Sequence, residues 1–348
     1  MTDIVTTTTA TGDPISRRQR PLRSEATAAA VAGFVGSLLV VVTAPVRSQA
    51  APSWRLRLPF VPAPGPRWFS AACFMAGMGL LGYGWFQLCG YARRSRIDGG
   101  RRLRTVAIVV TLWSLPIVLG PPLLSNDVYS YAAQGELGSR GYDPTKWGPI
   151  ALGGGPFLRA ADEIWHHNPS PYGPVWNKLS AGVVSITGHD PANAIWGFRV
   201  VITLSVLLAG WALARLAREL NVDPAFAVAM GIGNPLMLVH IIGGIHNDGL
   251  MLALLLVGLV LARRRHRWLA LFVITAAAAV KLPAAAGLVY LGWNWRDELN
   301  TRARRLLGAV VAGIVGMFLI VWLSVEVRMG MGWLGALRGT SKVMSTFA

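Results

Sequence analysis

Long runs of apolar residues, separated by short polar connections, constrain this chain more than any other feature. A transmembrane helix needs roughly 20 mainly apolar residues to cross the hydrocarbon core of a bilayer. Nine segments approach or meet this requirement, at roughly 26–44, 69–91, 105–124, 193–214, 224–243, 248–262, 268–280, 282–294 and 306–328. Only 14% of the residues are charged, whereas soluble domains carry about a quarter. We therefore predict an all-α protein, a polytopic bundle of transmembrane helices.

Arginine and lysine predict the orientation of these segments, because they concentrate in cytoplasmic connections. If all nine segments cross the membrane, five basic blocks share one side, namely the tail before residue 26 and residues 92–104, 215–219, 263–267 and 296–305. We assign this side to the cytoplasm of a multi-pass plasma membrane protein. One connection, 45–68, disagrees, because it would lie outside and yet carries arginines and no acidic residue.

The short segments 268–280 and 282–294 leave two alternatives. They form either one tilted helix or a helical hairpin broken near Lys281 and Pro283, and the parity of the basic blocks favours the hairpin. The chain then divides into a disordered cytoplasmic tail (1–25), three transmembrane helices (26–124), an extracytoplasmic loop (125–192), and the remaining transmembrane helices with the start of a further outer loop (193–348).

The net charge of +17 raises the question of a nucleic-acid partner. The arginines occur in short blocks between apolar runs, however, as membrane topology requires. We therefore expect membrane lipids as partners and no nucleic acid. Cys73 and Cys89 lie in one predicted helix, about 24 Å apart along its axis, so they cannot form a disulfide with each other.

The outer loop 125–192 is rich in tryptophan, tyrosine, proline and glycine, and aromatic residues of this kind are typical of the bilayer interface. Within it, residues 157–167 have helical periodicity, which predicts a helix lying flat on the membrane. Its apolar face would consist of Leu158, Ala161, Ile164 and Trp165. Residues 172–188 are moderately apolar, but a crossing there would break the charge parity, so we predict an interfacial or re-entrant helix.

Ionisable residues beside membrane helices are costly and invite a functional interpretation. Asp127 follows segment 105–124 in the sequence Ser125-Asn126-Asp127, which is typical of a helix start. It either merely begins a short helix or forms a carboxylate at the outer rim of the bundle. In the second case the helix N-terminus favours its ionised form, which can accept a proton from a hydroxyl nucleophile.

A second polar group, Gly243 to Asp248, connects segments 224–243 and 248–262 on the same predicted side. It is either a turn with a helix cap or a second wall of the same site. In the second case His246 and Asp248 bind a phosphate, a sugar hydroxyl or a metal. Two such residues are too few to define a metal site, so we predict no metal ligands and no cofactor, while leaving a divalent metal open.

Two basic side chains, Lys281 and Arg199, each allow two interpretations. Lys281 either snorkels to the nearer surface or supplies a charge for an anionic headgroup between helices. Arg199 either anchors its helix at the interface, which is the simpler interpretation, or forms a forked pair with phosphate. The sequence has no nucleotide-binding fingerprint, which argues against a nucleotide-sugar donor.

Six motifs occur in order along the chain: Ser125–Gly135, Gly141–Pro144, Pro171–Pro174, Gly233–Leu236, Gly243–Asp248 and Ala279–Pro283. In this order they resemble the actinobacterial polyprenol-phosphate-mannose-dependent α-(1→6)-mannopyranosyltransferases, which are GT-C fold glycosyltransferases. The resemblance covers about residue 105 to the end. It implies a GT-C-like bundle with its active site on the extracytoplasmic face, a polyprenyl-phosphate-mannose donor, and a lipid-anchored mannan or lipomannan acceptor of the cell envelope.

The resemblance also implies a catalytic residue, because GT-C enzymes carry an essential acidic residue in an outer loop after an early helix, and Asp127 matches it. The candidate substrate-binding residues are Asn126, Tyr129, Tyr172, Arg199, His246, Asn247, Asp248 and Lys281. Polyprenyl phosphate is already a good leaving group, so one carboxylate suffices for an inverting displacement that forms an α-(1→6) linkage, unlike the two carboxylates of a glycosidase.

Two further expectations follow. Members of this family continue with more membrane helices beyond the position of Ala348, so we expect this sequence to be shortened at its C-terminus. The alternative function is a polytopic transporter or a lipid-linked sugar flippase, which predicts internal repeats and polar residues near the bilayer midplane. Lys281 favours that alternative, but the two halves of the sequence show no repeat.

Overall fold

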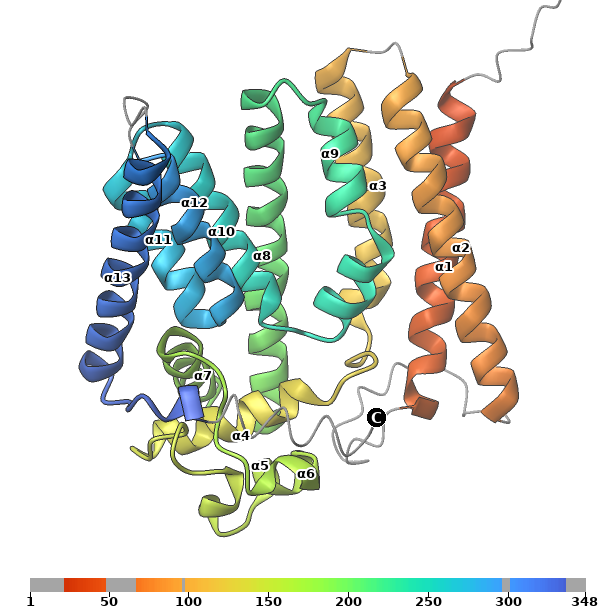
Figure 1. Cartoon of the computed structure of the whole chain (residues 1–348). Helices are drawn as coiled ribbons and strands as arrows, with labels where there is room; N and C mark the ends of the chain where they lie inside the picture. Colours follow the sequence, from red (N-terminus) through yellow and green to blue (C-terminus); the bar gives the residue numbers. More distant parts are fainter. Residues whose placement is uncertain (1–21, 48–66, 96–97, 296–300, 336–348) are drawn as a thin grey trace, which may run out of the picture.

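The computed structural model describes residues 22–47, 67–95, 98–295 and 301–335 (Figure 1). Most of the predicted disordered tail lies outside the described residues, and helix α1 already begins at Leu22. The exceptional basic connection at 45–68 also lies almost entirely outside them. Within the described ranges all regular secondary structure is helical, so the prediction of an all-α fold is confirmed.

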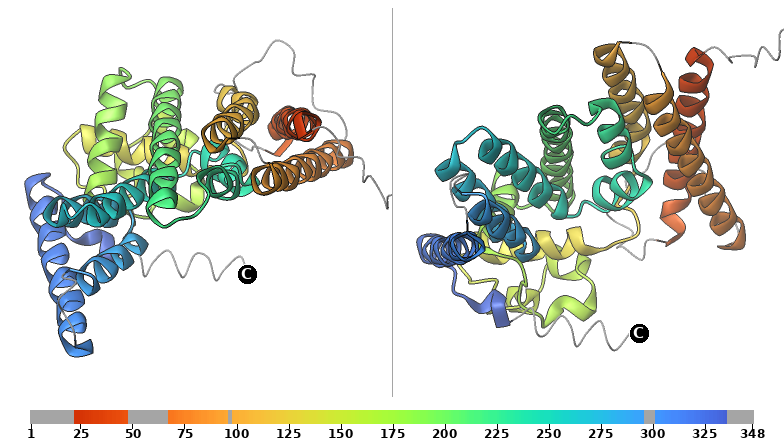
Figure 2. Two further views of the ribbon diagram at one scale, coloured as in Figure 1. Left: turned by 90° about the horizontal axis from the view of Figure 1, so that it is seen from above. Right: turned by 45° about the horizontal axis from the view of Figure 1, so that its top comes forward.

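Five of the described helices are long and apolar enough to cross a membrane. They are α1 (Leu22–Arg47), α2 (Arg67–Arg94), α3 (Gly99–Leu119), α8 (Pro191–Glu219) and α13 (Arg302–Glu326). Figure 2 shows α1–α3 grouped on one side of the bundle and α10–α13 on the other, with α8 and α9 between them. The number of candidate spans reaches six if one bent helix pair counts as a span, so nine crossings are not confirmed.

The difference arises in residues 224–293, which fold as short helices instead of full spans. These are α9 (Pro224–Gly231), the π-helix η3 (Met237–Gly243), α10 (Asp248–Arg263), α11 (Arg267–Val280), the 3-10 helix η4 (Leu282–Ala285) and α12 (Ala286–Trp293). Helices η3 and α10 meet at 110°. Glycine and proline cause these breaks, because glycine tolerates sharp turns and proline lacks the N–H that a helix interior needs.

The hairpin alternative for residues 268–294 is correct. Lys281 leaves the helix with extended backbone angles, φ −153° and ψ 127°, and the chain then reverses into α12 (Figure 1). The ring of Trp268, at the start of α11, lies 5.0 Å from the ring of Trp295, just after α12. The two ends of this segment therefore lie side by side.

The connection between α3 and α8 forms a compact helical region at one end of the bundle (Figure 1). It contains α4 (Asp127–Ser139), the 3-10 helix η2 (Pro149–Leu152), α5 (Pro156–Ala160), α6 (Glu163–His166) and α7 (Pro174–Ile186). Helix α7 has 13 residues, about 20 Å, so it is too short to cross a bilayer, as predicted. It packs against α4, where Gly135 leaves room for the backbone of Ser180.

The single amphipathic helix predicted for residues 157–167 is wrong. The chain is extended at Ala161 (ψ 141°), which separates α5 from α6. The cause is tertiary: Ala161 is buried in the core, and the next residue, Asp162, accepts a hydrogen bond from the Asn126 amide at 3.2 Å. Helical periodicity reports local preference and misses such contacts.

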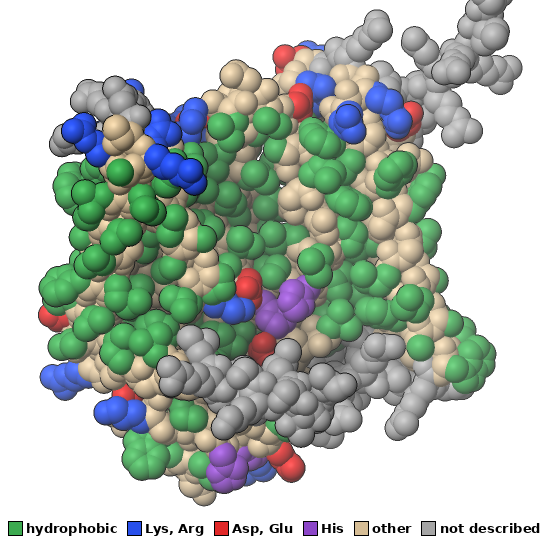
Figure 3. Space-filling view, viewed as in Figure 1, with side chains coloured by type: hydrophobic (Ala, Val, Ile, Leu, Met, Phe, Trp, Pro, Cys, Tyr) green, Lys and Arg blue, Asp and Glu red, His purple; other side chains and the backbone are tan. Residues whose placement is uncertain are grey.

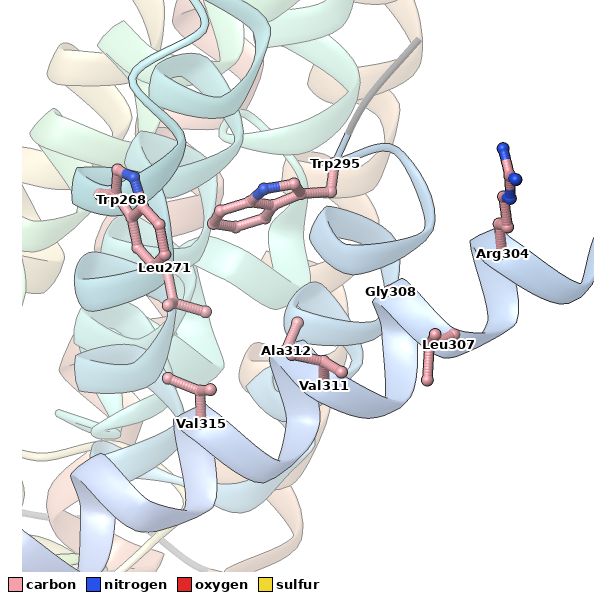
Figure 4. A pocket seen from close by; sticks show the side chains of 9 residues that line it. All are labelled: Trp268, Leu271, Trp295, Arg304, Leu307, Gly308, Val311, Ala312 and Val315. Carbon is pink, nitrogen blue, oxygen red and sulfur yellow. The ribbon is translucent and has the colours of Figure 1, made fainter. Parts of the chain in front are cut away.

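Basic side chains mark the opposite end of the bundle. Lys and Arg gather in Figure 3 along the edge formed by the α10–α13 helices and by α1–α3. The face visible in Figure 3 is largely hydrophobic between the two ends, and Phe86, Leu207 and Phe318 are among the exposed apolar residues of the bundle. This distribution is the one expected for a bundle that faces lipid laterally.

Asp143 joins the compact helical region between α3 and α8 to the segment that follows α13. Its Oδ1 accepts hydrogen bonds from the backbone N–H (2.9 Å) and hydroxyl (2.7 Å) of Thr145. Its Oδ2 accepts one from the backbone N–H of Gly330 at 2.9 Å. Nearby Trp333 is almost completely buried. One carboxylate therefore holds together two segments that lie far apart in the sequence.

We predict that Asp143→Ala will release this junction, because three hydrogen bonds lose their acceptor. The expected loss is about 1–3 kcal/mol of local stability. Hydrogen–deuterium exchange should become faster in residues 143–147 and 329–335 and stay unchanged in α8. The matched control is Glu163→Ala, which removes an exposed acid of the same region. Equal acceleration in both variants would contradict the assignment.

Candidate functional site

The candidate site lies where four interruptions of the helical chain meet. Two backbone hydrogen bonds join them in pairs: the N–H of Leu123, just before α4, donates to the carbonyl of Gly243, in the turn before α10, at 2.9 Å, and the N–H of Gly173, in the loop before α7, donates to the carbonyl of Val280, at the end of α11, at 3.3 Å. Side-chain contacts between Asp127 and His246 and between Lys281 and Asp248 link the two pairs. Four of the six sequence motifs therefore come together in space.

Gly173 allows the closest of these approaches. A Cβ atom at this position would collide with the carbonyl oxygen of Ala279. The N–H of Gly173 also satisfies the carbonyl of Val280, one of the groups left without a helical partner where α11 ends. Pro283 forces α11 to end, because proline has no N–H with which to continue the helix. The motifs Pro171–Pro174 and Ala279–Pro283 therefore depend on each other structurally.

Asp127 occupies the first turn of α4, as the sequence predicts. Its backbone N–H donates to the hydroxyl of Ser125 at 3.1 Å. Its side chain is 31% exposed, and its Oδ2 lies 3.4 Å from Nδ1 of His246. The carboxylate is thus accessible from one side, fixed in place by its helix, and next to the N-terminal end of the helix dipole, which stabilises negative charge.

His246 and Asp248 come from the turn between η3 and α10, so the structure brings the two predicted walls of the site together. The His246 side chain is only 8% exposed. It stacks on the ring of His240, with 4.1 Å between ring centroids. Its Nε2 is buried and has no hydrogen-bond partner among the described residues. This nitrogen remains available to a bound molecule.

Asn247 is fully buried, yet neither its amide nitrogen nor its amide oxygen has a partner within the described part of the chain. Buried polar atoms are nearly always hydrogen-bonded, and each unsatisfied one costs roughly 1–3 kcal/mol. The polar atoms of His246 and Asn247 therefore identify this turn as a place where water or a ligand supplies hydrogen bonds. The sequence alone singled out the turn but not the burial of these groups.

Lys281 forms an ion pair with Asp248, and its Nζ lies 2.6 Å from Asp248 Oδ2. Lys281 therefore does not snorkel away to a distant surface. An ammonium group has three hydrogen-bond donors, so two remain after Asp248 has accepted one. The pair is 35% and 25% exposed, which leaves it in reach of a ligand.

Two tyrosines, Tyr172 and Tyr131, lie close to each other near the site. Tyr172 lies half-buried in the loop before α7. Burial raises the pKa of its phenol, and the negative charges of Asp127 and Asp248 raise it further. Burial likewise raises the pKa of Tyr131, whose ring contacts that of Tyr172 edge-on at 5.2 Å. Both phenols stay neutral at physiological pH. The half-buried phenol of Tyr172 can exchange hydrogen bonds with a sugar hydroxyl, whereas Tyr131 is almost completely buried and supports it.

Arg199 and Tyr129 have positions that argue for a structural role. Arg199 is buried and donates to the carbonyl of Ile117 at 2.7 Å, close to the end of α3. Its guanidinium carbon lies 6.0 Å from the ring centroid of Trp196. Tyr129 is buried in the core. The described contacts of Arg199 fit neither a forked phosphate pair nor an exposed interfacial anchor, and they stabilise the junction of α3 and α8.

The site lies part of the way along the bundle. In Figure 1 the turn before α10 and the break after α11 lie above the lower ends of α8 and α13. Figure 3 shows histidine, acidic and basic side chains clustered within an otherwise hydrophobic face at this level. Among the described residues no group of three or more His, Cys, Asp or Glu side chains is arranged to hold a metal ion.

Two residues that support the site are given no role by the sequence patterns. His240 is one of them, since its ring stacks on that of His246, six residues later. Trp176 is fully buried against Tyr131, with 5.0 Å between ring centroids, and so supports the wall that carries Tyr172. A second histidine six residues before His246 was the available signal for His240.

Comparison with known proteins places these residues in a family context. A family model described as alpha-(1->6)-mannopyranosyltransferase, N-terminal domain, matches residues 30–297. That range contains every candidate site residue. No solved structure gives a significant match.

Curated proteins that the chain resembles carry the same name as the family model. Alpha-(1->6)-mannopyranosyltransferase B of Corynebacterium glutamicum is 30% identical over 345 residues, covering 90% of this chain and 57% of that protein. Alpha-(1->6)-mannopyranosyltransferase A of Mycobacterium tuberculosis is 31% identical over 284 residues, covering 79% and 54%. Alpha-(1->6)-mannopyranosyltransferase A of C. glutamicum is 29% identical, covering 68% and 52%. The chain thus spans about half the length of the curated relatives it matches.

We predict that Lys281→Met will lower the stability of the protein, because it leaves the Asp248 carboxylate partly buried without its partner. We expect a loss of about 1–2 kcal/mol, since the pair is partly exposed to solvent. Adding Asp248→Asn should restore most of this loss. Thermal unfolding of the purified protein in detergent tests both, with Lys178→Met, an exposed lysine on α7, as control. Failure of the second substitution to rescue would disprove the coupling.

Proposed function

The chain belongs to the α-(1→6)-mannopyranosyltransferase family, and from that premise we propose that it transfers mannose from polyprenyl-phosphate-mannose to a mannan or lipomannan acceptor. The proposed reaction forms an α-(1→6) linkage with inversion at the anomeric carbon. The observation that carries the proposal is the contact between Asp127 and His246, 3.4 Å apart at the meeting point of the helix breaks. This contact joins the accessible carboxylate of Asp127 to the buried ring of His246, whose Nε2 has no hydrogen-bond partner among the described residues.

In the proposed step Asp127 acts as the general base. Its carboxylate accepts the proton of the acceptor hydroxyl as that oxygen attacks the anomeric carbon of mannose. The bond between the anomeric carbon and the phosphate oxygen breaks, and the polyprenyl phosphate leaves with the bonding electron pair. No general acid is required, because a phosphate is a stable anion. His246 would hold the carboxylate in position through Nδ1.

The donor phosphate requires hydrogen-bond donors. Lys281 retains two ammonium protons beyond the one directed at Asp248, and the Asn247 amide is unsatisfied within the described chain. These two residues are the proposed phosphate contacts. Arg199 is not included, since it is engaged at the end of α3. The neutral phenol of Tyr172 is the proposed contact to a sugar hydroxyl.

An apolar groove supports a lipid-linked donor over a nucleotide sugar. It has a volume of about 450 Å³ and runs between α3 and α8 from Leu103 to Val118, which corresponds to about 22 Å of helix. Ile242 lines it and directly precedes the polar turn of the site. A flexible hydrocarbon chain in this groove would lead from the interior of the membrane to the phosphate contacts.

The distribution of charge supports an extracytoplasmic active site. Arginines gather at the end of the bundle that is opposite α4–α7 (Figure 3), and basic residues favour the cytoplasmic side. A lipid-linked acceptor on the outer leaflet would then meet Asp127 directly. In the same arrangement the aromatic residues of the outer region would limit the access of water to the reacting atoms.

Asp127→Asn and Asp127→Ala test the catalytic assignment. We expect each to lower the transfer rate roughly 100-fold or more, the usual contribution of a general base. The assay supplies membranes containing the variant with labelled polyprenyl-phosphate-mannose and a mannan oligosaccharide. Donor binding by Asp127→Asn should stay within a few-fold of the unmodified protein, and Glu163→Gln should transfer normally. Full transfer by both Asp127 variants would refute the assignment.

A cysteine-labelling experiment tests the proposed orientation. After Cys73 and Cys89 have been replaced by serine, Ile150→Cys places a thiol on an exposed side chain of the outer region. We expect a membrane-impermeant maleimide to label it on intact cells. Arg101→Cys, at the basic end of α3, should react only after the cells are opened. The reverse pattern would overturn the orientation and with it the extracytoplasmic site.

A further inference from the structure

Two left-handed backbone turns lie directly beside the candidate site. Ile245 precedes His246 and has a φ of 56°. Leu124 lies three residues before Asp127 and has a φ of 59°. Residues other than glycine seldom adopt a positive φ, because the Cβ atom then crowds the backbone, and for a β-branched residue such a φ is an outlier. Strained backbone of this kind persists where the surrounding structure imposes it, and it gathers at functional sites.

Ile245 follows the π-helix η3 at a position where glycine is usual. The N–H of His246 reaches back to the carbonyl of Ile241 at 3.1 Å, which is the pattern of a helix end closed by one left-handed residue. The same conformation follows α8, α10 and α13 at exposed residues, namely Asn221, Arg265 and Arg328. Ile245 is instead fully buried, and it is the only β-branched residue with a positive φ in the part of the chain that the structure describes. The core therefore holds a bulky side chain in a turn that its backbone disfavours.

Leu124 forms a tighter turn before α4. The N–H of Ser125 donates to the carbonyl of Leu123 at 2.7 Å, which closes a three-residue turn around Leu124. A turn of this size with a positive φ at its centre is rare and strained. The hydroxyl of Ser125 then accepts the backbone N–H of Asp127 at 3.1 Å. Leu124 is 54% exposed, so burial of its own side chain does not explain the turn, which instead sets where α4 and Asp127 begin.

The two turns are fastened to each other. The N–H of Leu123 donates to the carbonyl of Gly243 at 2.9 Å. The side chain of Leu123 is almost completely buried and lies against Gly243, where an added Cβ atom would come within 2.6 Å of it. A shift of one turn therefore moves the other. Asp127 and His246, which follow the two turns, meet with 3.4 Å between Oδ2 and Nδ1.

We infer that Leu124 and Ile245 are positioning residues, whose left-handed turns keep the Asp127 carboxylate in contact with the His246 imidazole. They act through these two side chains, by fixing the carboxylate where it accepts the proton of the acceptor hydroxyl. A displacement of about 1 Å in such a site can lower a rate roughly 100-fold. The inference rests on the proposed role of Asp127 in transfer, but the contact itself can be measured without transfer.

Two substitutions loosen the turns. Leu124→Val places a β-branched residue at a positive φ, and Ile245→Ala removes the buried side chain that keeps its turn in place. We expect each to lower kcat for mannose transfer roughly 10- to 100-fold and to change KM for polyprenyl-phosphate-mannose little. Leu124→Asn, whose side chain tolerates a positive φ, should retain most of the rate. In an Asp127→Ala background neither loosening substitution should lower the rate further, because both act through that carboxylate.

Two matched controls separate positioning from general stability. Asn221→Val places a β-branched residue at the left-handed position after α8, at the end of that helix remote from α4 (Figure 1). Ile320→Ala empties a comparably buried position on α13. Both should lower the thermal stability as their counterparts do and leave kcat unchanged. An equal loss of kcat in the controls would overturn the inference.

The ring ¹⁵N chemical shifts of His246, in protein labelled at histidine, report the contact directly. Asp127→Ala defines the shifts of the ring without its carboxylate neighbour. Leu124→Val and Ile245→Ala should move the His246 shifts toward these values, and the two controls should not. Unchanged shifts in both variants would overturn the inference, as would an unchanged kcat in both where Asp127→Ala is inactive. Full transfer by Asp127→Ala would refute the proposed function instead, and the shifts alone would then decide whether the two turns position these side chains.

Discussion

The structure depends on how interrupted helices satisfy their polar groups within apolar surroundings. Every helix end exposes backbone groups that need partners, and water is scarce in a membrane. Here the ends satisfy one another: Gly173 donates to Val280 at the end of α11, and Leu123 donates to Gly243 before α10. Because each break supplies the partner of another, the breaks must lie together. That requirement creates the site.

The same requirement governs the side chains of the site. Lys281 and Asp248 form a partly exposed ion pair, and the loss of either partner is expected to cost about 1–2 kcal/mol. Asp127 lies beside His246, which stacks on His240. Unsatisfied atoms remain on His246 and Asn247 in the described chain. The paired charges stabilise the site, and the unsatisfied atoms are those to which water or a polar ligand would supply hydrogen bonds.

The two ends of the bundle differ in chemistry. The compact helical region between α3 and α8 is held to the segment after α13 by Asp143 and carries aromatic walls, whereas Lys and Arg side chains gather at the opposite end. This is the asymmetry expected of a multi-pass membrane protein, because basic residues favour one side of the membrane.

The sequence by itself determined the helical class, the positions of nearly all the apolar helices and the three polar motifs around Asp127, His246 and Lys281. It did so because apolar periodicity and isolated charges are local properties. Only the tertiary structure decided which motifs meet, that Lys281 pairs with Asp248, and that Arg199 caps the end of α3. It also replaced the continuous helix at 157–167 by two short ones and several full crossings by short helices. These outcomes depend on hydrogen bonds between residues far apart in the chain, which no local pattern encodes.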